Sequence, residues 1–147
     1  MPPSDASEMQ RPAAFYLNSG EDPMFGEPAL TIAGNVAEVL FAKGVMAELS
    51  ERLSLKPEFK QHEGHVVPAD RLGRLASVCR DLADRYDDAD AIYEGPTFRI
   101  RRQTGGKRID STVVAAASGA EIRAALTQLG NLASEGASQG VAVLADL

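Results

Sequence analysis

The sequence predicts an α+β fold with about three helices packed on a small antiparallel sheet built around a β-hairpin over residues 97–114. Two patterns carry this prediction: three segments repeat apolar residues at helical spacing, and one segment alternates apolar and charged residues on either side of a Gly-Gly pair. The 147 residues suffice for one sizeable core but not for two. Because the chain has no tryptophan and few other aromatics, Leu, Val, Ile and small residues must fill that core.

The first 30 residues predict little regular structure. Residues 1–14, rich in proline, serine and charge, are expected to form a flexible arm, which leaves residues 15–147 as a single globular domain. Residues 15–30 mix aromatics with glycine and proline and favour an irregular segment anchored to the core. The functional alternative is a ligand loop that displays Glu21, Asp22 and Glu27. The chain shows no signal-peptide pattern and no apolar stretch of about 20 residues, so we expect a cytoplasmic protein without membrane contact.

The first predicted helix runs from Asn35 to about Leu53. Asn35 suits the N-cap position, and Glu38 follows three residues later as a capping-box partner. The apolar residues of this segment lie on most sides of the helix, which is typical of a central, buried one. Gly44 either bends the helix or marks a close helix contact. Residues 55–67, between Leu53 and Pro68, are interpreted as a connector.

Two further helices are predicted. The second covers residues 69–88, with Pro68 at its start. Its apolar face includes Cys79, which we interpret as a small buried hydrophobe rather than a nucleophile. The third begins at the capping box of Ser118 and Glu121 and ends near Gly136. Residues 140–147 form either a strand or a docked terminal segment. The apolar face of the second helix comprises Leu72, Leu75, Ala76, Cys79, Leu82, Ala83 and Tyr86, and that of the third Ile122, Ala125, Leu126, Leu129 and Ala133.

The hairpin prediction includes a register. Gly105-Gly106 is a favoured two-residue turn, and a turn there opposes Thr104 to Lys107. The remaining pairs follow two residues at a time, which makes one face mostly apolar. We expect this face to cover the helices and Arg101 to meet Asp110 in a favourable cross-strand pair. The apolar face holds the pairs Phe98–Val113, Ile100–Ser111 and Arg102–Ile109; the other holds Arg99–Thr112, Arg101–Asp110 and Gln103–Arg108.

The chain reverses its charge just before the hairpin turn. Residues 81–94 carry six carboxylates and one arginine, whereas residues 99–108 carry five cations and no anion. The net charge is −6, so the chain without the basic segment carries −11. Such an acidic balance disfavours nucleic acid and suits a protein partner with a basic cleft, although an acidic surface also serves solubility alone. The candidate partner-binding residues are Asp81, Asp84, Asp87, Asp88, Asp90, Glu94, Arg102, Lys107 and Arg108.

Nothing in the sequence points to catalysis. The phosphate-loop, dinucleotide-binding and nucleophile-elbow motifs are absent, and no cofactor is expected. His62 and His65 are three residues apart with Gly64 between them, which does not fit the two-histidine helix of a metalloprotease. A metal site would need a third ligand from Asp or Glu, so a polar connector is the preferred interpretation.

Three functions remain. The preferred one is a non-catalytic protein–protein interaction module, in one form an inhibitor or immunity-type protein that neutralises a toxin or another enzyme. The alternative is a nucleic-acid-binding regulator of winged-helix type that uses the basic hairpin as its wing. Against it, the acidic run after the second helix would repel phosphate. The third is a small-molecule enzyme or binder that uses residues 15–27 and the two histidines.

Overall fold

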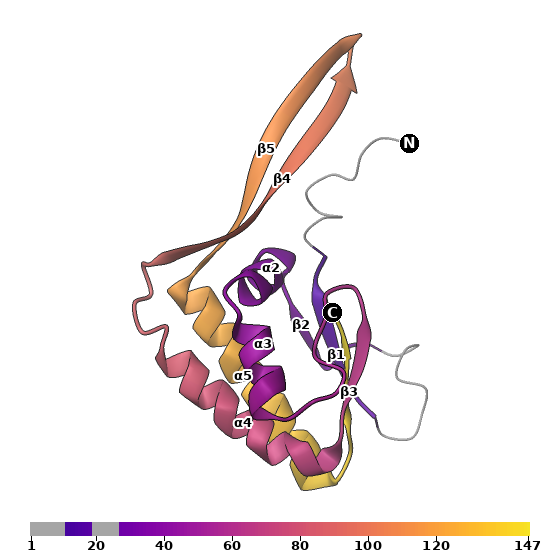
Figure 1. Cartoon of the computed structure of the whole chain (residues 1–147), viewed down its shortest axis with the longest axis vertical. Helices are drawn as coiled ribbons and strands as arrows, with labels where there is room; N and C mark the ends of the chain where they lie inside the picture. The colour runs from indigo at the N-terminus through magenta and orange to yellow at the C-terminus, as the bar shows by residue number, and fades with distance from the viewer. Residues whose placement is uncertain (1–10, 19–26) are drawn as a thin grey trace.

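The computed structural model describes residues 11–18 and 27–147, with the backbone only at Ile100, Arg101, Arg102 and Thr104. The fold is α+β, as predicted, and its strands form two antiparallel sheets (Figure 1). The described elements, in chain order, are β1 (Ala13–Leu17), β2 (Leu30–Ile32), α2 (Gly34–Ala42), α3 (Val45–Arg52), β3 (Gly64–Val67), α4 (Ala69–Asp84), β4 (Ile92–Thr104), β5 (Lys107–Ser118), α5 (Gly119–Gln139) and β6 (Val143–Asp146).

The larger sheet differs from the predicted one, because the hairpin is not part of it. Its strand order is β2-β1-β6-β3, and β6 pairs antiparallel with both β1 and β3. Alternate residues on these strands, Phe15, Val67 and Val143 among them, are buried against the helices. Residues 140–147 therefore contain an inner strand of this sheet, so the first of the two predicted alternatives, a strand rather than a docked terminal segment, is confirmed.

Two segments that looked irregular contain strands of this sheet. Residues 15–30 contribute to β1 and include Leu30, the first residue of β2 (Leu30–Ile32), and the 55–67 connector includes β3. The strand β1 begins at Ala13, within the arm expected over residues 1–14. Residues 1–10 of that arm, and Glu21 and Asp22 of the ligand-loop alternative, lie outside the described residues.

The helix predicted over residues 35–53 is divided in two. Gly44 adopts a left-handed conformation with φ 75°, which ends α2 and forms the N-cap of α3. The capping box of Asn35 and Glu38 is not formed, since Ala33 is the N-cap and makes no side-chain cap hydrogen bond. Instead, Asn35 Nδ2 donates to the carbonyl oxygen of Ala116 at 2.9 Å, and buried Glu38 accepts from Gln61 Nε2 at 2.8 Å.

The other two helices, α4 and α5, pack side by side and contribute a large share of the core (Figure 1). The predicted capping box at α5 is confirmed: Ser118 Oγ accepts from the Glu121 N–H, and Glu121 Oε1 accepts from the Ser118 N–H. The helix α5 continues to Gln139 and ends at Gly140 with φ 69°. The helix α4 ends at Asp84, before the predicted Asp88. Its apolar face is buried as predicted, except for the half-buried Tyr86.

Cys79 lies inside this helix pair and behaves as the predicted small hydrophobe. Its side chain is fully buried, and burial raises the pKa of the thiol to about 12. The thiolate that reacts with oxidants and metals is therefore nearly absent at neutral pH.

The hairpin register is confirmed pair by pair, from Thr104↔Lys107 to Phe98↔Val113. Gly105 and Gly106 both have positive φ, 59° and 79°, which defines a type I′ turn. The two strands extend beyond the predicted 97–114 to Ile92 and Ser118, with an irregularity between Glu94 and Thr97. They form a separate two-stranded sheet that projects away from the helices (Figure 1).

Candidate functional site

The ribbon formed by β4 and β5 is exposed, along its outer part, for contact with another molecule (Figure 1). Its base packs on α2, where Ala115 and Ala117 are buried. Small side chains there let the strand approach the helix closely. Beyond Thr97 and Val114 the two strands stand clear of the body (Figure 1). At a rise of about 3.4 Å per residue, this outer part is about 25 Å long.

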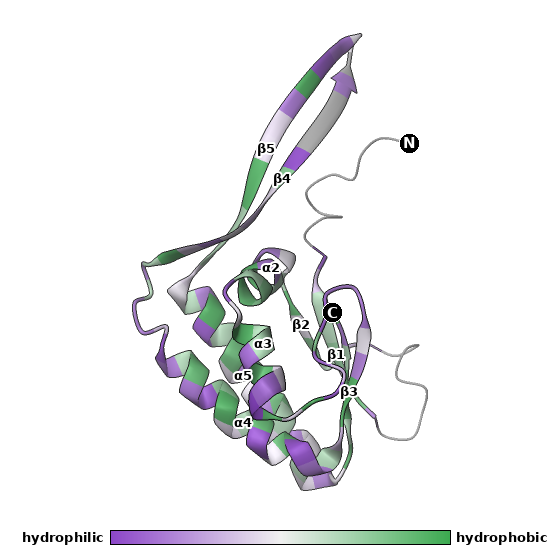
Figure 2. Cartoon of the chain, viewed as in Figure 1, coloured by the Kyte–Doolittle hydropathy of each residue, from purple (hydrophilic) through white to green (hydrophobic). Residues whose placement is uncertain are grey.

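The prediction that the apolar face of the hairpin covers the helices is wrong for this outer part. Ile109 is 50% exposed and Val114, on the opposite face, is 42% exposed. Figure 2 shows the resulting bands of apolar and polar residues along β5. The reason is the length of the ribbon, since α2 reaches only its base. An apolar side chain on a strand without a covering layer is available for contact with another molecule.

The ribbon cations whose side chains the structure describes are also exposed. Arg99 lies on β4, and Lys107 and Arg108 follow the turn. Arg108 Nε lies 3.6 Å from Asp110 Oδ1. Arg101 opposes Asp110 in the register, as predicted. The backbone places Arg102 opposite Ile109 near the tip, while its side chain lies outside the described part of the structure.

The acidic run does not share a surface with this tip. It lies at the end of α4 and at the base of β4, and the whole of β4, about 40 Å long, separates the base from the tip. In the structure the two oppositely charged segments therefore lie far apart, with the carboxylates near the base of the ribbon and the cations near its tip. The structure does not bring the acidic and basic candidate residues together on one face.

Several of the acidic candidates are also held by neighbouring arginines. Asp87 Oδ1 accepts from Arg123 Nη1 at 2.6 Å, and Asp84 lies 3.8 Å from the same guanidinium. Asp88 Oδ1 accepts from the Asp90 N–H at 3.0 Å, within the turn that precedes β4. These contacts give the acidic run a structural role, which is to position the turn against the start of α5.

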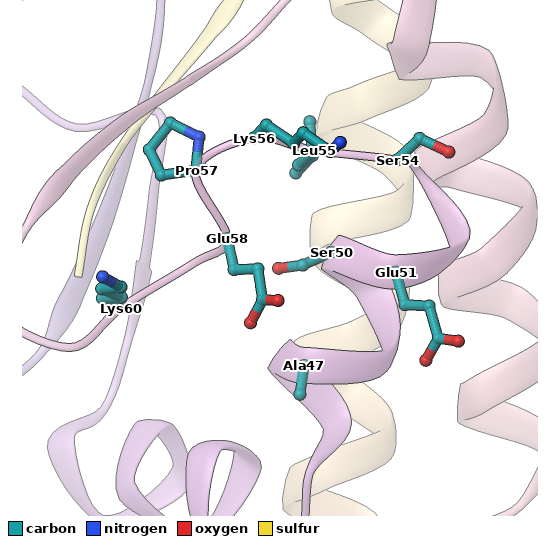
Figure 3. A pocket seen from close by; sticks show the side chains of 9 residues that line it. All are labelled: Ala47, Ser50, Glu51, Ser54, Leu55, Lys56, Pro57, Glu58 and Lys60. Carbon is teal, nitrogen blue, oxygen red and sulfur yellow. The ribbon is translucent and has the colours of Figure 1, made fainter.

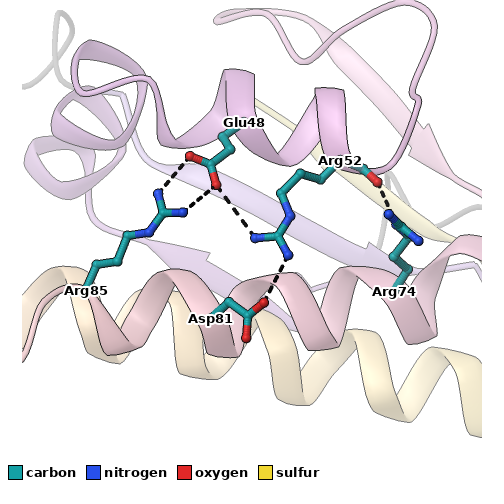
Figure 4. A network of polar contacts seen from close by, with 5 residues as sticks. All are labelled: Glu48, Arg52, Arg74, Asp81 and Arg85. Atoms are coloured by element: carbon teal, nitrogen blue, oxygen red, sulfur yellow. Dashed lines mark hydrogen bonds and ion pairs between the residues drawn. The ribbon is translucent and has the colours of Figure 1, made fainter.

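Asp81 belongs to a network that joins α3 to α4 (Figure 4). It accepts from Arg52 Nη2 at 2.9 Å, and Arg52 also lies 3.7 Å from Glu48. Glu48 accepts two hydrogen bonds from Arg85, at 2.8 and 2.9 Å. Hydrogen bonding to Arg85 holds the pKa of Glu48 below its ordinary value of 4.5.

Replacing Glu48 with glutamine is expected to lower the free energy of unfolding at neutral pH. Because the pKa of Glu48 is lower in the folded state than in the unfolded state, its stabilisation is complete above pH 4.5 and is lost as the pH falls through the folded-state value. The stability difference between wild type and Glu48→Gln should therefore shrink in acid. Urea unfolding at several pH values measures it, with exposed Glu51→Gln on the same helix as the control. A difference that persists unchanged at pH 3 would contradict the assignment.

A hollow between α3 and residues 54–60 has a volume of about 770 Å³ (Figure 3). Its one buried polar side chain, Ser50, is already engaged: Oγ donates to the Met46 carbonyl oxygen and accepts from the Phe59 N–H. The hydroxyl therefore fixes the loop onto the helix and is not poised as a nucleophile.

The two histidines are not arranged as metal ligands. His65 lies on β3, where its Nε2 accepts from the Lys60 N–H at 3.0 Å and its ring meets Phe59 edge-on. His62 is exposed in the preceding turn. Among residues 11–18 and 27–147, no group of three His, Cys, Asp or Glu side chains is placed to hold a metal ion.

Sequence reasoning missed Ile109 and Val114 as binding candidates. The predicted register places Ile109 on the face expected to cover the helices, and it assigns no role to Val114. The signal that could have revealed them is the length of the β-forming run, which continues from Val113 through three alanines to Ser118. Only its small-residue end can pack closely on a helix, which leaves the larger side chains beyond the body.

Comparisons with protein-family models, with curated proteins and with solved structures find no match for this chain. Within the part that the structure describes, no helix is both long enough and apolar enough to cross a membrane. The geometry of the ribbon is therefore the basis for a functional proposal.

Proposed function

We propose that this chain is a non-catalytic protein–protein interaction module that contacts its partner through the projecting ribbon. The observation that carries the proposal is the half-exposed Ile109, on a strand face that the helices of its own chain do not cover. Exposed Lys107, on the same face of β5 as Ile109, adds a polar contact beside this apolar side chain. An apolar centre with a polar rim is the usual anatomy of a protein interface.

The ribbon replaces the acidic run as the preferred docking surface. Arg52 and Arg123 already neutralise Asp81, Asp84 and Asp87, so a partner would have to displace contacts that stabilise the fold. Contacts on the ribbon displace nothing from the body. An inhibitor or immunity-type protein is one form of this proposal, in which the ribbon enters the cleft of an enzyme.

The exposed cations Arg99, Lys107 and Arg108 favour a second candidate, a nucleic-acid-binding regulator with the ribbon as its wing. We rank it lower because the chain carries a net charge of −6, with Asp88, Asp90 and Glu94 at the base of the ribbon among its carboxylates. Those carboxylates would repel the phosphates of a nucleic acid.

Partner capture with matched variants tests the proposal. Tagged wild type, Ile109→Asp and Val66→Asp are expressed in the source cell, and co-purified proteins are quantified by mass spectrometry. Val66 is a matched control because it is 58% exposed and lies on β3 of the other sheet.

We expect Ile109→Asp to lower recovery of the partner by about tenfold or more, and Val66→Asp to leave it unchanged. Equal recovery by all three proteins, or recovery of nucleic acid alone, would overturn the proposal. The identity of the captured protein tests the inhibitor form.

A further inference from the structure

We propose that the outer edge of β5 pairs with β5 of a second copy of this chain, antiparallel and around a two-fold axis at Ser111. The pairing would join two ribbons into one four-stranded sheet. This inference concerns the edge of the ribbon, whereas the proposed function concerns its apolar face. It therefore stands or falls independently of that function.

The turn decides which backbone groups face outward. A type I′ turn closes on a hydrogen-bonded pair, here Thr104 and Lys107. Alternate residues from Lys107 onward therefore bond to β4, and the even-numbered residues 108–114 direct their N–H and C=O groups to the outer edge. A row of such groups on a strand is a template for pairing with another strand.

Of the two edges of the ribbon, β5 is the better suited to pairing. The β4 edge carries Pro96, which has no N–H, at the irregularity between Glu94 and Thr97. The β5 strand has no proline. Near its base, the carbonyl oxygen of Ala116 is already bonded to Asn35 of α2. The available edge is therefore residues 107–114.

The charges of the ribbon favour an antiparallel second copy as the occupant. The tip is cationic, with Lys107 and Arg108, and the base is acidic, with Asp88, Asp90 and Glu94. Antiparallel pairing lays the tip of one ribbon along the base of the other, where opposite charges attract. Parallel pairing would lay like charges together. A two-stranded ribbon alone is also marginally stable in water, and two more strands would stabilise it.

Among axes at the middle of the 107–114 edge, two exclusions select the register. An axis at Asp110 would oppose two aspartates directly, which is unfavourable. An axis at Thr112 would place Arg108 opposite Ala116, where Asn35 occupies the edge. An axis at Ser111 avoids both, pairing residue 110 with 112 and residue 108 with 114. The two Ser111 residues then form a non-hydrogen-bonded pair with Cα atoms about 4.5 Å apart.

This short separation makes a disulfide test specific. Cys79 is buried and its thiol pKa is raised to about 12, so a new cysteine is the reactive one. We expect purified Ser111→Cys to form a covalent dimer on mild oxidation, because the distance suits a disulfide. Gln103→Cys, exposed on β4 near the tip, is the control and should remain monomeric on a non-reducing gel. Equal crosslinking of both variants, or of neither, would overturn the register.

Sedimentation of proline variants tests the edge itself. Proline at Thr112 removes an outward N–H from β5, and proline at Arg99, the residue directly opposite, removes one from β4. We expect wild type and Arg99→Pro to sediment as dimers and Thr112→Pro as a monomer, all with the same circular dichroism. A dimeric Thr112→Pro or a monomeric wild type would overturn the proposal; duplex DNA binding by a monomeric wild type at low salt would favour the wing instead. Partner capture by Thr112→Pro separates this failure from failure of the proposed function.

Discussion

The Gly119→Ala variant is expected to lose about 3 kcal/mol of stability, a large share of what a domain of this size has. Gly119 is the first residue of α5, is buried, and donates its N–H to the carbonyl oxygen of Ala91 at 2.8 Å. A methyl group at this position would overlap the carbonyl oxygen of Asp88 and lie 3.1 Å from its carbon. Both atoms are backbone, so relief requires the turn between α4 and β4 to move.

Gly73→Ala is the matched control for this variant. Gly73 lies on the exposed face of α4, and a methyl group there meets no atom within 4 Å. Alanine favours the helix, so this variant should gain about 0.5–1 kcal/mol. Urea unfolding at one fixed protein concentration measures both, since association would shift the apparent stability. A Gly119→Ala protein as stable as wild type would show that the turn does not press on α5 as described.

The second large effect is expected at Leu72, where alanine should cost about 2–5 kcal/mol. Leu72 is fully buried in α4 and faces Gly136 of α5. A methyl group on Gly136 would lie 2.7 Å from Leu72 Cδ1, so the two helices approach closely because that position carries no side chain. Truncating Leu72 leaves a cavity beside this glycine.

A double-mutant cycle checks the contact. Gly136→Ala should destabilise the wild-type protein strongly, through Leu72 and through the Val141 carbonyl oxygen at 3.1 Å. In the Leu72→Ala protein the methyl group added at position 136 has room where the Leu72 side chain was. The loss of stability caused by Gly136→Ala should therefore be smaller in that background. Equal costs of Gly136→Ala in the two backgrounds would mean that Leu72 and Gly136 do not touch.

Local sequence patterns predicted the structure well where the interacting residues are close together in the sequence. The hairpin register and the capping box of Ser118 and Glu121 involve residues close in sequence, and both are confirmed. The same pattern at Asn35 and Glu38 failed, because Ala116 and Gln61 recruited those side chains from distant segments. A capping motif is thus reliable only where no tertiary partner competes for it.

The larger sheet could not be predicted for a related reason. Its strands have three to five residues each and pair across nearly the whole chain, as Phe15 with Ala145. Strands that short carry little periodicity. The candidate site was predicted in part. Its cations at Lys107 and Arg108 were identified, but the arginines that hold the acidic run could not be located from sequence.

The inner position of β6 has a consequence for the order of folding. The strands β1 and β3 do not pair with each other and are joined only through residues 143–146. During synthesis, β1 leaves the ribosome early but must wait for the 143–146 segment before its central pairing can form. The helices α4 and α5 are separated by a shorter stretch of chain than β1 and β6, so less loop-closure entropy opposes their contact. We therefore infer that the helical half assembles first and that the sheet closes last, with its edges exposed to other strands until then.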